Sequence, residues 1–161
     1  MAHVDMVGLI DFMSKMVLQA FPDQFSQCYF GDVGIYPPKA FQGNTGEMRS
    51  VLVLQPLHDK LETDFTTPAS ECRTLGINVA VLVNMTPFFE ALPMEAFGER
   101  MLVEQITKVR GFLTRDTNFT LGGRVLSTTV GDVNWTWQQR GNNAIRAAAI
   151  TYEAKVLQQR M

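Results

Sequence analysis

The chain has 161 residues, of which 46% are hydrophobic and 19% are charged. A chain of this length and composition can bury a core of its own, which argues against disorder over most of it and against a need for stabilising disulfides or metals. The formal net charge is −2 and the pI is about 5.6. The sequence therefore lacks the excess of Lys and Arg that is typical of nucleic-acid-binding proteins. We therefore expect one domain over residues 1–161 and no specific nucleic-acid binding.

The two cysteines, Cys28 and Cys72, lie far apart in the sequence. The first residues do not form a secretory signal, because His3 and Asp5 stand where a basic segment would lie and no small-residue cleavage site follows. No run approaches the ~18 apolar residues that span a bilayer. We expect unreactive thiols in a reducing compartment, with one disulfide left open as an alternative, and a protein made in a cytosol without membrane contact.

Two amphipathic helices are predicted, at residues 5–21 and 94–113. Asp5 can cap the first helix and Pro22 ends it, and in both helices apolar residues recur at three- and four-residue spacing. The apolar faces contain Met6, Ile10, Met13, Val17 and Phe21 in the first helix and Leu102, Ile106, Val109 and Leu113 in the second, where Phe97 and Met101 widen the buried face.

The clearest predicted strand covers residues 74–85, in which apolar side chains alternate with small or polar ones. Residues 51–55 form a short apolar run that Pro56 bounds, which is typical of a buried strand. The segment between these two strands is polar and is interpreted as a loop. Shorter elements are predicted at residues 27–30 and 33–36 (strands), 43–46 (a turn), 58–70 (the polar loop) and 87–92 (a turn or short helix).

The C-terminal third is predicted to form a long β-hairpin. The alanines at 147–149 also allow a helix, and the β-branched residues of Ile150-Thr151-Tyr152 favour a strand. The fold class that follows is α+β, with a mostly antiparallel sheet packed by two main helices and a long C-terminal β-hairpin. The hairpin combines strand candidates at residues 124–129 and 132–139, a bulge at Gly131, a turn at 140–143 and a return strand at 144–157.

The residue patterns of enzymes and metal sites are missing from this sequence. The neighbours His58 and Asp59 could act as a dyad, but no nucleophile motif accompanies them. Cys28 and Cys72 lack metal-ligand spacing, and Gly122-Gly123 follows a helix, which is the wrong order for a phosphate loop. Glu95 and Glu99 share a helical face and are interpreted as solvent-facing. We expect no catalytic, cofactor or metal site, and no enzymatic activity.

Two groups of residues are candidates for contact with other proteins. Trp135 and Trp137 share one strand face with Val133, where packing in the core is the favoured interpretation and a subunit interface the alternative. Polar segments that are long for a small domain supply the second group. These are the hairpin tip, Arg140, Gly141, Asn142 and Asn143, and the loop that begins with His58 and Asp59.

The order of the predicted elements resembles that of the tail-terminator (tail-completion) proteins of long-tailed bacteriophages and of related neck and minor tail proteins. The strand Asp132-Val133-Asn134-Trp135-Thr136-Trp137 and the strand Ala149-Ile150-Thr151-Tyr152-Glu153 carry most of this likeness. The resemblance implies a structural virion protein, assembled in the host cytoplasm, that forms a hexameric ring at the head-proximal end of the tail. Such a ring ends the tail tube and joins it to the head–tail connector, with DNA passing through it.

Other functions stay open at this point. A head-closure or connector subunit of the neck would have the same order of elements. A small non-viral binding domain is a further alternative and predicts no self-association. A small enzyme that uses His58 is the third, and it predicts a pocket around this residue.

Overall fold

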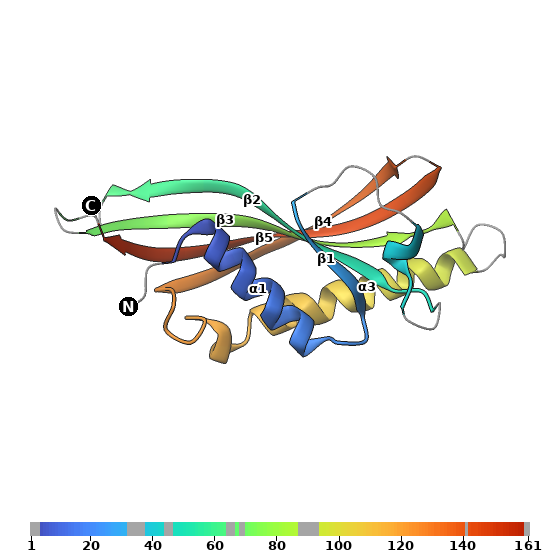
Figure 1. The fold of residues 1–161 in the computed structure, drawn as a ribbon, viewed down its shortest axis with the longest axis horizontal. Coiled ribbons are helices and arrows are strands. Elements are labelled where there is room, and N and C mark those ends of the chain that lie inside the picture. The colour runs from blue at the N-terminus through green and yellow to red at the C-terminus, as the bar shows by residue number, and fades with distance from the viewer. Residues whose placement is uncertain are drawn as a thin grey trace.

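The computed structural model describes residues 4–31, 38–43, 47–63, 67, 70–86, 94–140 and 142–159. Five strands form one sheet in the order β1-β2-β3-β5-β4, in which only β1 and β2 are parallel. The predicted α+β class with a C-terminal hairpin is confirmed (Figure 1). The elements are α1 (Met6–Ala20), β1 (Phe25–Phe30), η1 (Pro38–Phe41), β2 (Ser50–Glu62), β3 (Ser70–Asn84), α3 (Met94–Leu113), η3 (Asp116–Asn118), β4 (Ser127–Arg140) and β5 (Asn143–Gln159).

The central strand β3 directs alternate side chains to the two faces of the sheet, which are packed differently. Its odd-numbered residues from Leu75 to Val83 are fully buried in the main core, as the alternation predicted. Its even face is different, because Ala80 and Leu82 belong to a second, smaller core that η1 covers through Ala40 and Phe41. The sheet is therefore packed on both faces, by the α-helices on one face and by the short 3-10 helix η1 on the other.

Both long helices lie on the same face of the sheet (Figure 1). The side-chain oxygen of Asp5 accepts a hydrogen bond from the backbone N–H of Gly8 at 2.7 Å, so Asp5 caps α1 as expected. Phe21, just after α1, makes an edge-to-face contact with Phe112 of α3 at 5.6 Å between ring centroids. The helices bury Leu9, Ile10, Met13 and Val17 of α1 and Leu102, Ile106, Val109 and Leu113 of α3.

The strand β2 is longer than the sequence indicated. It continues through Pro56 to Glu62, so the prediction of a loop over residues 58–70 is wrong for residues 58–62 and for Ser70, where β3 begins. Pro56 is tolerated because β1 pairs with β2 only as far as Leu54, which leaves the missing N–H of the proline at a sheet edge. The register shifts between Pro56 and His58, and the exposed part of β2 begins there.

Strand β4 is one continuous element rather than the two expected. Residues 124–126 lie before it, and the register shift falls between Val130 and Val133, which confirms a bulge around Gly131. A Cβ at Gly131 would lie 3.3 Å from the backbone oxygen of Thr151, so the close approach of β5 favours glycine. Arg110 of α3 donates a hydrogen bond to the Gly131 carbonyl at 3.2 Å and fixes the bulge against the helix.

The return strand β5 confirms the strand interpretation over the helical one, and it pairs with β3 from Ile145 to Gln159. The predicted strand at residues 33–36, the segment 87–92 and most of the turn at 43–46 lie outside the described residues.

The cysteines are free, with Cys72 buried and Cys28 half-buried. Burial raises the pKa of the Cys28 thiol to about 11, against the opposing effect of a hydrogen bond with Ser14, and burial also raises the pKa of Cys72. At pH 8 only roughly one Cys28 in a thousand is then ionised, and the thiolate is the reactive form. Iodoacetamide should therefore label the folded protein slowly at both positions and the urea-unfolded protein fast. Rapid labelling of Cys28 without urea would contradict this burial.

Candidate interaction surface

Trp135 and Trp137 lie on the outer strand β4 and are exposed by 40% and 50%. The expectation that they pack in the core is therefore wrong, while their predicted common face is confirmed by their pairing opposite Ala148 and Arg146 of β5. That face is the one the helices cover further in, where Val133 still packs against the core. The tryptophans extend this face to the edge of the sheet, with no strand beyond them in the described part of the chain.

Arg146 contacts both tryptophans and also forms an ion pair with helix α3. Its guanidinium carbon lies 6.0 Å from the ring centroid of Trp135 and 5.1 Å from that of Trp137. The same guanidinium donates to both carboxylate oxygens of Glu99 in α3, each at 3.2 Å from Nε. Its side chain is only 17% exposed, so a charged group sits between two rings and a carboxylate. The Glu99 side chain is 40% exposed, so it still meets solvent as expected, and the ion pair with Arg146 is what the sequence did not indicate.

The hairpin tip is anchored to the end of β3. Asn84 donates a side-chain hydrogen bond to the Asn143 side chain at 3.1 Å, and the backbone N–H of Ala144 donates to the Thr86 hydroxyl at 2.8 Å. Arg140 and Asn143 face each other in the register, so two residues, Gly141 and Asn142, connect the strands. Gly141 itself lies outside the described residues, and Asn142 is exposed.

His58 and Asp59 point to opposite faces of the sheet, because they are neighbours in a strand rather than in a loop. The His58 ring lies over Gly76, where a Cβ would approach it to 2.4 Å, and its Nε2 lies 3.6 Å from the Glu153 carboxylate. Asp59 accepts from Nε of Arg73 at 2.5 Å. The two side chains therefore cannot act together, which removes the geometric basis of a His–Asp dyad.

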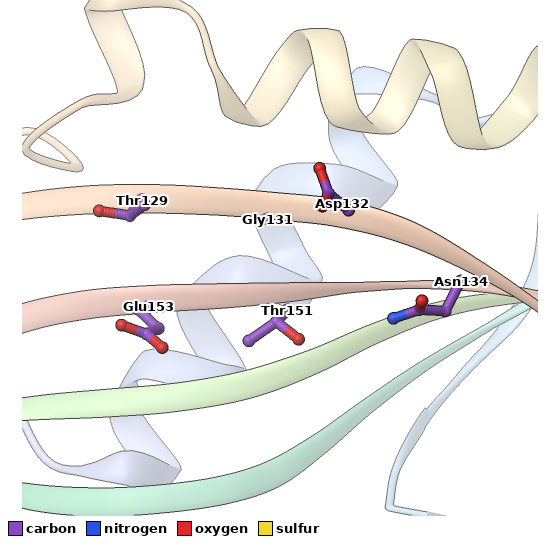
Figure 2. A pocket seen from close by; sticks show the side chains of 6 residues that line it. All are labelled: Thr129, Gly131, Asp132, Asn134, Thr151 and Glu153. Carbon is purple, nitrogen blue, oxygen red and sulfur yellow. The ribbon is translucent and has the colours of Figure 1, made fainter.

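A pocket of about 370 Å³ lies at the bulge of β4 (Figure 2). Thr151 and Glu153 alternate along β5 with the core residues Ile150 and Tyr152, so the pocket opens on the face away from α1. Its hydroxyls, amide and two carboxylates can accept hydrogen bonds from a polar or cationic group of a partner. The pocket is lined by Thr129, Gly131, Asp132, Asn134, Thr151 and Glu153.

The candidate residues thus fall into two separate places. The strand registers place Trp135, Trp137 and the tip near the C-terminal end of β3, and His58 and Asp59 toward its N-terminal half. Sequence reasoning missed Glu153 and the role of Arg146. The signal for Arg146 was present, since a charged residue interrupts the apolar face of β5 and had no evident partner in the sequence.

Within the described ranges, no group of three potential ligands is placed to hold a metal ion. In the same part of the chain, no helix combines the length and the apolar character that crossing a membrane requires. Comparison with protein-family models found no match, and comparison with curated proteins also found none.

Proposed function

We propose that this chain is a structural subunit of a bacteriophage tail, which forms a ring at the head-proximal end, ends the tail tube and joins it to the head connector. The observation that carries an assembly function is the aromatic surface of β4, where Trp135 and Trp137 are exposed on an outer strand. Tryptophan is enriched at protein interfaces and depleted from surfaces that remain in water. An outer strand also offers backbone groups to a neighbouring chain.

The two edges of the sheet differ from each other, which suits a head-to-tail contact. One edge ends in β4 with its tryptophans, and the other ends in β1 and in the outer part of β2, where residues 56–61 are exposed, Leu57 and Leu61 among them. A ring closes when one surface of each subunit meets a different surface of the next. We therefore infer that β4 of one subunit faces the β1–β2 side of its neighbour, with the hairpin tip and the His58 region directed toward tube and connector.

A head-closure or connector subunit of the neck would use the same surfaces, so the partner decides between these functions. The tail-terminator proposal predicts binding to the end of tail tubes, and a connector subunit predicts binding to the portal side instead. The enzyme alternative loses support because His58 and Asp59 lie on opposite faces of the sheet.

The test measures the mass of the protein by light scattering and images it with and without tail tubes of its phage. We expect rings, either in solution or on tube ends, and tubes that stop growing when the protein is added. The double variant Trp135→Thr/Trp137→Thr should stay folded but lose ring formation and tube capping by at least about tenfold, as central interface tryptophans commonly do.

The matched control is Thr136→Ser/Gln138→Thr, which changes the same strand on its other face, outside the pocket lining, and should keep capping. A wild-type protein that ignores tube ends and stays monomeric would refute the proposal. If the tryptophan variant still caps tubes, the contact between subunits lies on a surface other than β4.

A further inference from the structure

The pocket at the bulge of β4 lies where a glycine meets a small side chain (Figure 2). Two glycines of the sheet differ in what fills the space beside them. At Gly76 the ring of His58 occupies the space that a Cβ would need. At Gly131 the atoms nearest to such a Cβ belong to Thr151, which lines the pocket. The space beside Gly131 therefore remains as a pocket of about 370 Å³.

Most polar side chains of this pocket are not used within the protein. Glu153 lies 3.6 Å from Nε2 of His58. Arg110 approaches the bulge from α3, but it donates to the backbone carbonyl of Gly131. In the part of the chain that the structure describes, the other polar side chains of the lining make no hydrogen bond or ion pair; these are Thr129, Asp132, Asn134 and Thr151. Their hydrogen-bonding groups are therefore available to a ligand.

The lining determines which chemistry a ligand needs. Asp132 and Glu153 carry its formal charges, and the described lining contains no cationic side chain. Ionised carboxylates only accept hydrogen bonds, and the carboxamide oxygen of Asn134 and the threonine hydroxyls add further acceptors. A guanidinium supplies five N–H donors in a planar fork and stays charged, whereas an ammonium supplies three donors at one point. A guanidinium therefore fits this acceptor-rich lining better than an ammonium does.

We propose that this pocket binds the guanidinium of an arginine side chain that a partner protein presents, with Asp132 and Glu153 as the charged acceptors. The pocket lies at the outer strand β4 and opens on the face away from α1 (Figure 2). A side chain of another protein can reach it there without passing a further strand of the described chain. Arginine is also enriched at protein interfaces, where its pairing with carboxylates gives strong, directional hydrogen bonds.

This contact is weak by itself and adds specificity to a larger interface. Asp132 is exposed and the Glu153 side chain is 42% exposed, and ion pairs that face water contribute little. The proposal does not rest on the tail function, because the pocket lies on the other face of the sheet from Trp135 and Trp137 and its test needs no tail tubes. Failure of arginine binding and failure of tube capping are therefore separate results.

The test measures binding of the blocked peptide acetyl-Gly-Arg-Gly-amide to the full chain by saturation-transfer NMR observed on the peptide. Matched peptides carry citrulline, which has the shape of arginine without its charge, or lysine in place of arginine. We expect saturable binding of the arginine peptide with a Kd on the order of millimolar. Binding should be about tenfold weaker for citrulline and about threefold weaker for lysine. Binding of free arginine without binding of the blocked peptide would indicate an amino-acid site and overturn the proposal.

Variants of the lining place the binding in this pocket. Glu153→Gln and Asp132→Asn should each weaken binding of the arginine peptide by about fivefold, since each removes one charge and keeps the shape. The matched control is Glu104→Gln, an exposed carboxylate of α3 outside the lining, which should leave binding within about 1.5-fold of the wild type. Circular dichroism checks that each variant is folded. Equal binding of the arginine and citrulline peptides, tighter binding of lysine, or unchanged binding by the folded carboxylate variants would refute the arginine site.

Discussion

Replacing Ile77 with alanine is expected to lower the free energy of unfolding by about 2–5 kcal/mol. Ile77 is fully buried on the central strand, between β2 and β5, and its side chain belongs to the core under both helices. Removing most of the side chain loses its transfer free energy and leaves a cavity that packed neighbours on both sides cannot fill. For a domain with roughly 5–15 kcal/mol of stability, this is a large share.

Urea unfolding followed by circular dichroism measures this effect. The control is Asn78→Ala, which changes the next residue, a half-buried side chain on the opposite face, and should cost well under about 1 kcal/mol. The slope of the unfolding free energy against urea should stay the same in both variants, which shows that the change lies in stability. Equal losses for Ile77 and Asn78 would mean that the two faces of β3 have been assigned wrongly.

Replacing Arg146 with alanine is expected to cost about 1–3 kcal/mol, the range for losing hydrogen bonds to a charged group. The guanidinium joins Glu99 of α3 to the rings of Trp135 and Trp137, so its removal also frees the tryptophans to move. We expect the tryptophan emission to shift to longer wavelength before any unfolding. Arg146→Lys should not restore the wild-type value, because an ammonium cannot bind both carboxylate oxygens and stack on a ring in the same way.

The control for this prediction is Arg100→Ala in α3. Arg100 pairs with Glu104 four residues on, but the side chains are 75% and 55% exposed, so the loss should stay below about 0.5 kcal/mol. If Arg146→Ala leaves both the emission and the stability unchanged, the link between the hairpin and α3 is a surface contact only. The β4 surface would then be positioned by the strand pairing with β5 alone.

The sequence by itself determined the elements whose signal is local. The strict alternation around Ile77 predicted both the strand and its buried face, because a strand turns successive side chains to opposite sides. The three- and four-residue spacing predicted α1 and α3, and Asp5 predicted the start of α1, because the cap bonds within its own first turn. Gly131 likewise predicted the bulge in β4.

Only the tertiary structure decided what depends on neighbouring strands. Whether Pro56 ends β2 depends on whether a strand lies beside it, and β1 stops before that point. Whether Trp135 is buried depends on the place of β4 in the strand order, since an alternating strand looks the same at the centre and at the edge of a sheet. The partners of His58 and Arg146 are distant in sequence, at Glu153 and Glu99, and no local pattern connects residues that meet only through the pairing of strands and the packing of a helix on them.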